Sequence, residues 1–320
     1  MATLVTGGTG LIGAQVARVL LERGEERPVL FDLNPSTRRL DDIAARVEVV
    51  QGDLGTFSHV LEAVKRAQPA AIYHLGGITS VPCEADPPAA LRANVLGTFH
   101  VLEAARLFGV PQVLFASSIA TYGYDLEPGP IDDRTLQRPN TVYGATKLFG
   151  ENLGRIYRRK YGLDFRGLRY PSIVGPGVTT PSLLQYTSGV IEASAKGEPV
   201  AIAVTPETRA PVLYLKDAAR AIVELAAAPA ERIATVTYLL AGVDPVPSAG
   251  ELADLVRARV PGARIDFRPD PALQQLLDQL LHPLTDRPAR TEWGWEPAYS
   301  LEGMVDDTLD ELRRHPQRYE

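Results

Sequence analysis

The chain has 320 residues, of which 45% are hydrophobic and 22% are charged. This composition is ordinary for a globular protein, and the length allows one large domain or a domain with a smaller lobe. The net charge of -6 argues against a nucleic-acid-binding protein, because phosphate backbones repel an acidic surface.

Cysteine content and the N-terminal sequence indicate in which cellular compartment the protein is expected. Cys83 is the only cysteine, so no internal disulfide can form, which fits a reducing cytoplasm. The N-terminus lacks a basic segment followed by an apolar run, and apolar runs elsewhere are shorter than the ~20 residues of a membrane helix. With five scattered histidines, no metal site is expected. We therefore expect a cytoplasmic protein without a membrane segment.

Apolar strand-like runs alternate with helix-like stretches along the first half of the chain. The near-continuous apolar strands indicate a parallel sheet covered by helices on both faces, the doubly wound α/β class. Strands are predicted at 3–6, 28–32, 47–53, 70–77, 112–118 and 164–170, and helices at 11–24, 57–67, 87–109 and around Tyr143.

The regular alternation ends after residue 170. Later elements predict a smaller C-terminal lobe over 171–320, some segments of which return to the sheet of 1–170. Helices are predicted near 182–196, 217–228 and 248–259, and strands near 200–204 and 263–267. The segment 268–290 is rich in Pro, Asp and Arg and receives no assignment.

A glycine-rich turn, "TGGTGLIG", lies between the first strand and the first helix. Gly7 allows a tight turn with positive φ, Gly10 lets the backbone approach a pyrophosphate, and Gly13 allows the helix to pack on the sheet. The N–H groups at the start of the helix then face the phosphates. The pattern predicts a dinucleotide-binding domain over 1–170; without a ligand it would be only a tight strand-to-helix turn.

Two carboxylates follow the second and third strands. Asp32 lies 19 positions after Gly13 and can accept hydrogen bonds from the adenosine ribose, while it would repel a 2′-phosphate. Arg38 and Arg39 come only six and seven positions later, so the sequence favours NAD over NADP. Asp53 could accept a hydrogen bond from the adenine amine, or it could be an ordinary turn aspartate.

The stretch "NTVYGATKLFG" places Tyr143 and Lys147 four positions apart, on one face of a helix. Tyrosine has an unperturbed pKa of about 10, and a neighbouring ammonium favours the phenolate. Ser117 and Ser118 end the fifth strand, at the edge where ligands bind in open α/β sheets. Together with the glycine turn, these residues predict a proton-transfer site.

These motifs, together with "GDL", "YHLGG", "NVLGT", "SSIATYG" and "LRYPSIVGPG", identify the family. The chain resembles the extended short-chain dehydrogenase/reductases, the NAD-dependent epimerases, dehydratases and dehydrogenases, over essentially its whole length. The resemblance implies that Tyr143 is the general base or acid and that Lys147 lowers its pKa and holds the nicotinamide ribose. It also implies that Ser118 orients the reacting oxygen, with Ser117 as its possible substitute.

The same resemblance implies the cofactor contacts. Asn94 matches a position that supports the active-site helix, and Tyr170 and Pro171 match the segment that lines the nicotinamide. The residues implied to bind NAD are Gly7, Gly10, Leu11, Ile12, Gly13, Asp32, Asp53, Leu54, Leu75, Asn94, Tyr143, Lys147, Tyr170 and Pro171.

The second half resembles the short-chain type of L-threonine 3-dehydrogenase more than it resembles sugar-nucleotide epimerases. In "GVTTPS", Thr179 and Thr180 match the threonine enzymes, but Pro181 stands where that family has an aspartate. A proline cannot pair with a substrate ammonium. Arg209 could bind a substrate carboxylate or could be a surface arginine. The substrate-binding candidates are Ser80, Ser117, Thr179, Thr180 and Arg209.

The resulting expectation is an NAD-dependent dehydrogenase that oxidises a secondary alcohol of a small polar substrate, such as a hydroxy acid or an amino acid. One alternative is a UDP-sugar 4-epimerase or dehydratase with tightly bound NAD, and another is an NAD-binding regulator without catalysis. The resemblance also implies a homodimer that pairs through the helices near 88–108 and 141–160.

Overall fold

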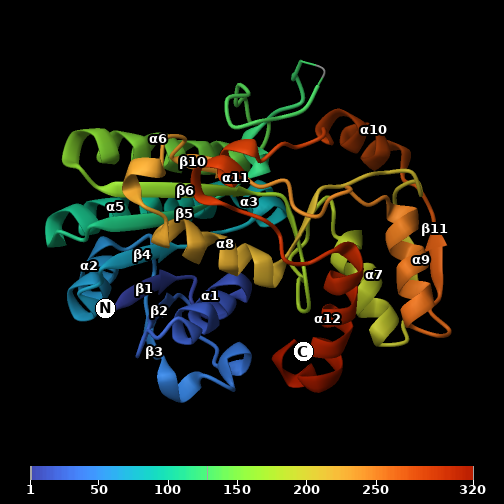
Figure 1. Cartoon of the computed structure of the whole chain (residues 1–320), viewed down its shortest axis with the longest axis horizontal. Coiled ribbons are helices and arrows are strands. Elements are labelled where there is room, and N and C mark those ends of the chain that lie inside the picture. The colour runs from blue at the N-terminus through green and yellow to red at the C-terminus, as the bar shows by residue number, and fades with distance from the viewer. Residues whose placement is uncertain (1, 128, 320) are drawn as a thin grey trace.

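The computed structural model describes residues 2–127 and 129–319. The described residues form a seven-stranded parallel sheet in the order β10-β6-β5-β4-β1-β2-β3 (Figure 1). Its strands are β1 (Thr3–Thr6), β2 (Val29–Asp32), β3 (Glu48–Gln51), β4 (Ala71–His74), β5 (Gln112–Ser118), β6 (Asp164–Tyr170) and β10 (Thr237–Leu239). The predicted α/β class with a parallel sheet is confirmed.

Helices cover both faces of this sheet because its central strands are apolar on both sides. Every residue of β1 and β4 is buried. One apolar cluster joins one face to α1 (Leu11–Glu22) and α8 (Leu215–Ala227). A second cluster joins the other face to α2 (Phe57–Ala67) and α5 (Gly97–Phe108), and α6 (Val142–Tyr161) packs beside α5.

The helix predicted over 87–109 is helical over that range, but it is not uniform. The structure has α4 (Pro87–Ala90), a π-helical turn η3 (Leu91–Leu96) and then α5. Gly109 ends α5 with φ 66°, a left-handed conformation that glycine adopts without strain, so the predicted stop is confirmed.

The smaller lobe has its own apolar cluster, which joins its helices to two short parallel strand pairs. The pairs are β7 (Ser172–Val174) with β9 (Val212–Tyr214), and β8 (Val200–Ile202) with β11 (Ile265–Phe267). The remaining helices are α3 (Ser80–Ala85), α7 (Tyr186–Ala195), α9 (Ala249–Arg259), α10 (Pro271–Leu280), α11 (Arg287–Trp293) and α12 (Leu301–Arg314). The short helical turns are η1 (Arg38–Leu40), η2 (Ala44–Arg46), η4 (Ile119–Thr121), η5 (Ala230–Arg232) and η6 (Pro316–Arg318).

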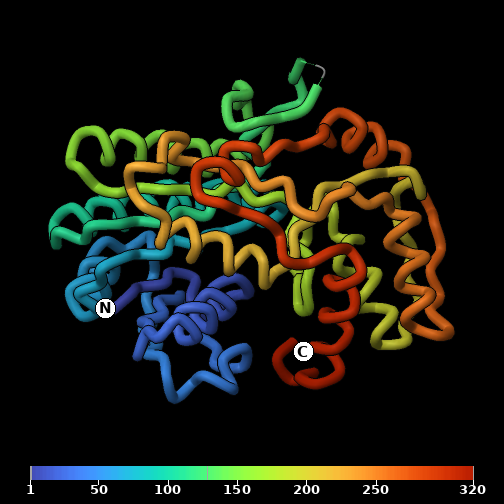
Figure 2. The backbone as a smooth tube through the Cα atoms, in the orientation of Figure 1, coloured from blue at the N-terminus to red at the C-terminus, as the bar shows by residue number. Residues whose placement is uncertain are grey.

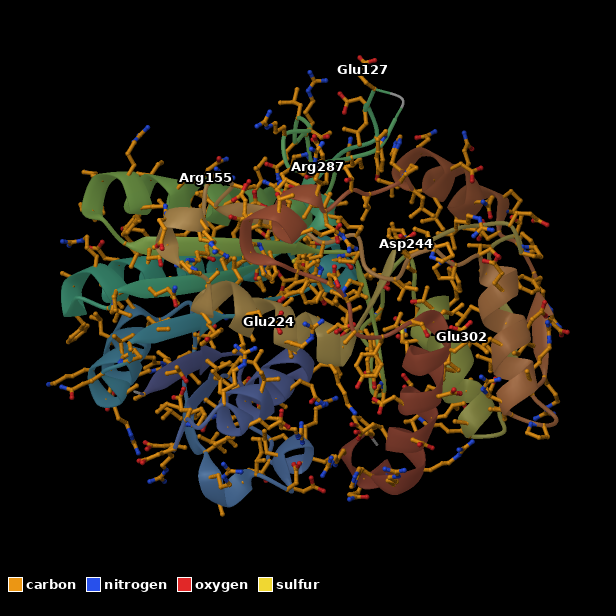
Figure 3. The ribbon with its side chains drawn as sticks, in the orientation of Figure 1. Glu127, Arg155, Glu224, Asp244, Arg287 and Glu302 are labelled. Atoms are coloured by element: carbon orange, nitrogen blue, oxygen red, sulfur yellow. The ribbon has the colours of Figure 1, made fainter. Side chains whose placement is uncertain are left out.

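Charged side chains surround both parts of the molecule. Arg155 on α6 and Glu224 on α8 lie on the sheet side, and Glu302 lies at the start of α12 on the side of the smaller lobe (Figure 3). Between α10 and α12 the chain crosses from the smaller lobe to the sheet and back, and α11 lies against β10 (Figure 2). The division into two domains at residue 170 stays a prediction.

Several elements were not predicted. The segment that returns to the sheet is β10, which pairs with β6, and the unassigned segment 268–290 contains α10 and the start of α11. The three-residue strand β10 shows too little alternation to stand out in the sequence, whereas the equally short β8 and β11 lie within predicted strands. The start of α10 did carry a signal, because Asp270 caps it from the position before Pro271, with Oδ1 accepting from Ala272 N at 2.8 Å.

Among the described residues, no helix is long and apolar enough to cross a bilayer, and no group of three or more His, Cys, Asp or Glu side chains could hold a metal ion.

Candidate active site

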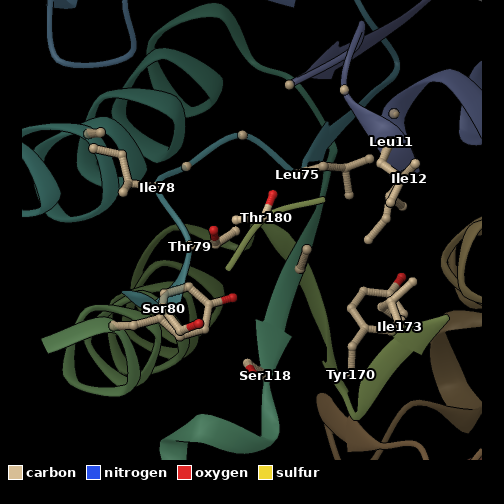
Figure 4. Close-up of a pocket in the computed structure, with 18 of the residues that line it drawn as sticks. Leu11, Ile12, Leu75, Ile78, Thr79, Ser80, Ser118, Tyr170, Ile173 and Thr180 are labelled. Atoms are coloured by element: carbon tan, nitrogen blue, oxygen red, sulfur yellow. The ribbon is translucent and has the colours of Figure 1, made fainter. Parts of the chain in front are cut away.

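A cavity of about 560 Å³ opens at the carboxyl ends of the strands. It lies where the strand order reverses, between β1 and β4, which is the usual ligand position in open α/β sheets. Figure 4 shows Leu11 and Ile12 on one side of the cavity and Ser80 and Ser118 on the other, with Thr79 and Thr180 between them. Its size is typical of a site for a small ligand or cofactor.

The glycine turn forms one wall because its backbone is packed too closely for side chains. Gly7 has φ +65°, and a Cβ there would lie 2.8 Å from Gly76 Cα. A Cβ on Gly13 would lie 2.2 Å from Gly7 O, so alanine would push the start of α1 away from the turn. No side chain caps α1, and its first N–H groups can therefore donate hydrogen bonds to phosphate oxygens. These features fit a dinucleotide.

Both predicted carboxylates line the same cavity. Asp32 Oδ2 accepts hydrogen bonds from the amide and the hydroxyl of Thr9, at 3.1 and 2.9 Å. Asp53 Oδ1 accepts from Gly55 N at 2.8 Å, and its other oxygen is 4.0 Å from Arg92. Leu54 and Leu75 add apolar surface beside them.

The predicted proton-transfer residues meet at the other end of the cavity. Thr141 caps α6 by accepting from Gly144 N at 3.0 Å, which sets Tyr143 in the first turn and Lys147 one turn later. Lys147 Nζ donates to Ala116 O at 2.8 Å and lies 5.6 Å from the centre of the Tyr143 ring. Ser118, at the end of β5, is hydrogen bonded to the Tyr143 hydroxyl.

Burial dominates the protonation of this group. It raises the pKa of Tyr143 to about 12, although the hydrogen bond with Ser118 opposes the rise. It lowers the pKa of Lys147 to about 8. The pKa of Tyr143 therefore moves upward here, opposite to the direction expected from Lys147 alone.

Two candidate residues have partners in the fold. Ser117 lines the cavity beside Ser118, and its hydroxyl donates to Glu151 Oε1 at 2.5 Å, so its role as a substitute for Ser118 stays a prediction. Arg209 does not line the cavity; it is exposed and pairs with Glu251 at 3.1 Å and with the carbonyl of Val246 at 2.6 Å. The structure therefore does not bring Arg209 to the site.

Some of the remaining candidates line the cavity, and others do not. Ser80, Tyr170, Pro171 and Thr180 line it, whereas Thr179 does not. Asn94 lies behind the wall, where its Nδ2 donates to Ile78 O at 2.9 Å and to Thr146 Oγ1 at 3.1 Å. It thus ties the loop after β4 to α6.

Several lining residues were missed, and three of them lie near the substrate candidates. Thr79 and Ile78 follow β4, and Ser182 follows Thr180 by two positions. Their signal in the sequence was position alone, since each lies in a loop at the carboxyl edge of the sheet or in the "GVTTPS" stretch that faces it.

Comparisons with known proteins agree with this geometry. The profile of the NAD dependent epimerase/dehydratase family matches residues 3–241. The mitochondrial L-threonine 3-dehydrogenase of Bos taurus is 30% identical over 312 residues, covering 96% of this chain and 81% of the relative. A D-erythronate dehydrogenase of Cupriavidus necator is 37% identical over 235 residues, covering 70% and 71%.

A solved structure extends the likeness to the whole fold. The holo form of a GalE-like L-threonine dehydrogenase from Cupriavidus necator superimposes with a TM-score of 0.88 at 30% identity, covering 98% of this chain and 100% of that one.

Proposed function

The chain belongs to the NAD-dependent epimerase/dehydratase family, within the extended short-chain dehydrogenases, and on that premise we propose that it oxidises a secondary alcohol of a small polar substrate. The observation that carries the proposal is the meeting of Tyr143, Ser118 and Lys147 in one cavity with an uncapped, glycine-lined helix start.

Each of the three residues has one task in this proposal. Ser118 holds the reacting hydroxyl of the substrate, and the Tyr143 oxygen takes the hydroxyl proton. Burial keeps the free phenol protonated, so ionisation of Tyr143 requires a nearby cation, and the Lys147 ammonium is the one placed to supply it. NAD, when bound, supplies the acceptor for the hydride that leaves the same carbon.

The substrate class follows from the relatives and from the cavity together. Thr79, Ser80, Thr180 and Ser182 give the substrate side hydroxyl groups suited to a polar ligand. The two curated relatives are named for a β-hydroxy amino acid and a polyhydroxy acid. We place the substrate in one of these two classes, although Pro181 removes the carboxylate that would pair with an ammonium.

A substrate panel tests the proposal. β-Hydroxy amino acids, polyhydroxy acids and UDP-sugars are each incubated with the enzyme and NAD, and NADH absorbance and sugar interconversion are followed. We expect NADH to form with a member of the first two classes. Interconversion of UDP-sugars without free NADH would establish the epimerase instead. Binding of NAD without any turnover would favour a regulator.

Cofactor choice gives a separate prediction, because we infer that Asp32 selects NAD. Asp32→Ala is expected to weaken NAD binding about tenfold, since a lost charge-assisted hydrogen bond is worth roughly 1.5 kcal/mol. It should also improve NADP binding, because the repulsion of the 2′-phosphate is removed. Calorimetric titration with both cofactors measures this. Asp41→Ala, in the same region but outside the cavity, is the control. An unchanged preference for NAD in Asp32→Ala would refute the assignment.

A second copy of the chain is the proposed partner. Large apolar side chains are exposed along the adjacent helices α5 and α6 and on the π turn before α5. Their number on neighbouring elements exceeds the single exposed apolar residues that are normal on a protein surface. They are Leu91, Leu96, Phe99, Leu107, Phe108, Phe149, Ile156 and Tyr161. We infer a homodimer in which these helices pair with their equivalents.

Disruption of that surface should yield a monomer. Phe149→Arg with Ile156→Asp places two charges in the proposed interface, and burying them without partners would prevent association. Light scattering should give the dimer mass for the wild type and the monomer mass for this variant. Leu183→Asp, similarly exposed but located just before α7 and far along the chain from both helices, should remain a dimer. A wild-type monomer would end the proposal.

A further inference from the structure

We propose that the buried ion pair between Glu151 and Arg169 is a positioning device for the active site, which fixes the ends of β5 and β6 against α6. The inference rests on the proposed function, since it assigns these residues an effect on turnover. Neither side chain lines the cavity, so neither can touch the reactants.

The pair is fully enclosed and bidentate. Each residue is 1% exposed. Arg169 Nε lies 2.9 Å from Glu151 Oε1, and a terminal guanidinium nitrogen lies 2.7 Å from Oε2. Two parallel bonds of this kind hold both side chains in one orientation, which a single contact would not do.

Further hydrogen bonds extend the pair into the surrounding chain. Ser117 donates to Glu151 Oε1 at 2.5 Å, and Gln137 donates to Oε2 at 3.2 Å. On the other side, Arg169 donates to the Tyr122 hydroxyl at 2.9 Å. The carboxylate thereby binds two neighbouring strands, because Ser117 and Arg169 are register partners in β5 and β6.

Three members of the network adjoin residues of the active site. Ser117 precedes Ser118, and Arg169 precedes Tyr170, the next register pair. Glu151 follows Lys147 by one helical turn, on the same face of α6. A shift of this ion pair would therefore move three cavity residues at once. The negative charge of Glu151 also partly opposes the lowering of the Lys147 pKa by burial.

A contribution to the stability of the fold does not by itself explain a buried ion pair of this kind. Removing two charges from water is costly, and buried ion pairs are often replaceable by apolar residues without loss of stability. Geometry offers a better reason, because displacements of about 1 Å at a reacting centre can lower rates about 100-fold.

The same strand contains a matched control. Arg166 is also buried and also pairs with a carboxylate, Asp164, at 2.7 Å, but it lies toward the amino end of β6. Arg166→Lys and Arg169→Lys make the same chemical change on one strand, the first far from the cavity and the second next to it. Ser117→Ala is the milder variant, since it removes one hydroxyl and leaves the ion pair in place.

Three quantities are measured for each variant: the melting temperature, the kcat and KM for the best substrate of the panel, and the emission of bound NADH. We expect both lysine variants to lose thermal stability. Of these two, Arg169→Lys alone should lower kcat, by about 10- to 100-fold with little change in KM, and alone should alter NADH emission. Ser117→Ala should lower kcat by several-fold while remaining folded.

The outcomes separate this inference from the proposed function. If no panel substrate reacts, the proposed function fails, while NADH emission still tests the network in the same proteins. Equal effects of Arg166→Lys and Arg169→Lys on kcat and on NADH emission would show that the pair is only structural and would overturn the inference. If Arg169→Lys does not fold, an unchanged kcat and unchanged emission in Ser117→Ala would overturn it.

Discussion

Tyr143→Phe is expected to lower kcat by about 100- to 10,000-fold, the range typical of a lost general acid or base. The substitution removes one oxygen from the end of the cavity and leaves the ring in place. Ser118 then lacks the phenol beside it, and Lys147, which donates to Ala116 O at 2.8 Å, is left without the hydroxyl proposed to take the substrate proton.

Initial rates of NADH formation with the best panel substrate measure this effect. NAD binding, followed by calorimetry, should be retained, because the glycine turn is untouched. Tyr157→Phe is the control: it removes the same atom from the same helix, but the Tyr157 hydroxyl donates to Glu103 at 2.8 Å outside the cavity. Undiminished turnover in Tyr143→Phe would show that the base has been assigned to the wrong residue.

Lys147→Met should abolish most activity and yet stabilise the cofactor-free protein at neutral pH. Burial lowers the pKa of Lys147 to about 8 from the 10.5 of an exposed lysine. Below pH 8 the folded protein therefore holds a buried charge that the unfolded chain would solvate. Methionine removes that cost, and we expect a gain of about 1–3 kcal/mol, reduced by the lost bond to Ala116.

The pH dependence has a definite sign. Between about pH 8 and 10.5 the unfolded lysine binds more protons than the folded one, so the wild-type protein gains stability as pH rises through this window. The advantage of Lys147→Met should be largest below about pH 8 and should shrink toward pH 10.5. Thermal unfolding of the cofactor-free protein across this range checks it.

A second lysine supplies the contrast. Lys216 lies 2.7 Å from Asp307 and 2.9 Å from Glu311, and these partners raise its pKa despite burial. Lys216→Met should therefore lower stability near neutral pH, opposite to Lys147→Met. If both substitutions changed stability in the same direction, burial would not be the dominant influence on Lys147.

Together these results would describe a site in which activity is obtained at the expense of stability. The buried lysine and the partly enclosed phenol are each unfavourable to ionise, and the fold tolerates them because apolar clusters on both faces of the sheet hold α6 in place. Such pairs of titratable groups with displaced pKa values are typical of catalytic sites.

The sequence alone determined the features that depend on residues close together in the chain. The glycines of residues 7–13 lie in one turn, Asp32 ends the next strand, and Tyr143 and Lys147 share one helix face. Local spacing settles such relations, because a strand, a turn and a helix each have a fixed geometry. The apolar strands likewise predicted a parallel sheet, and the structure contains it.

Only the tertiary structure decided relations between distant segments. The sequence favoured Ser118 over the adjacent Ser117, but it could not show that Glu151, 34 residues after Ser117, accepts a hydrogen bond from the Ser117 hydroxyl. The sequence left open whether Arg209 reaches the cavity, and in the structure Arg209 instead pairs with Glu251. Likewise β10 joins β6 from about 70 residues away along the chain. Pairings of this kind depend on how the whole chain packs, and no local pattern of residues encodes them.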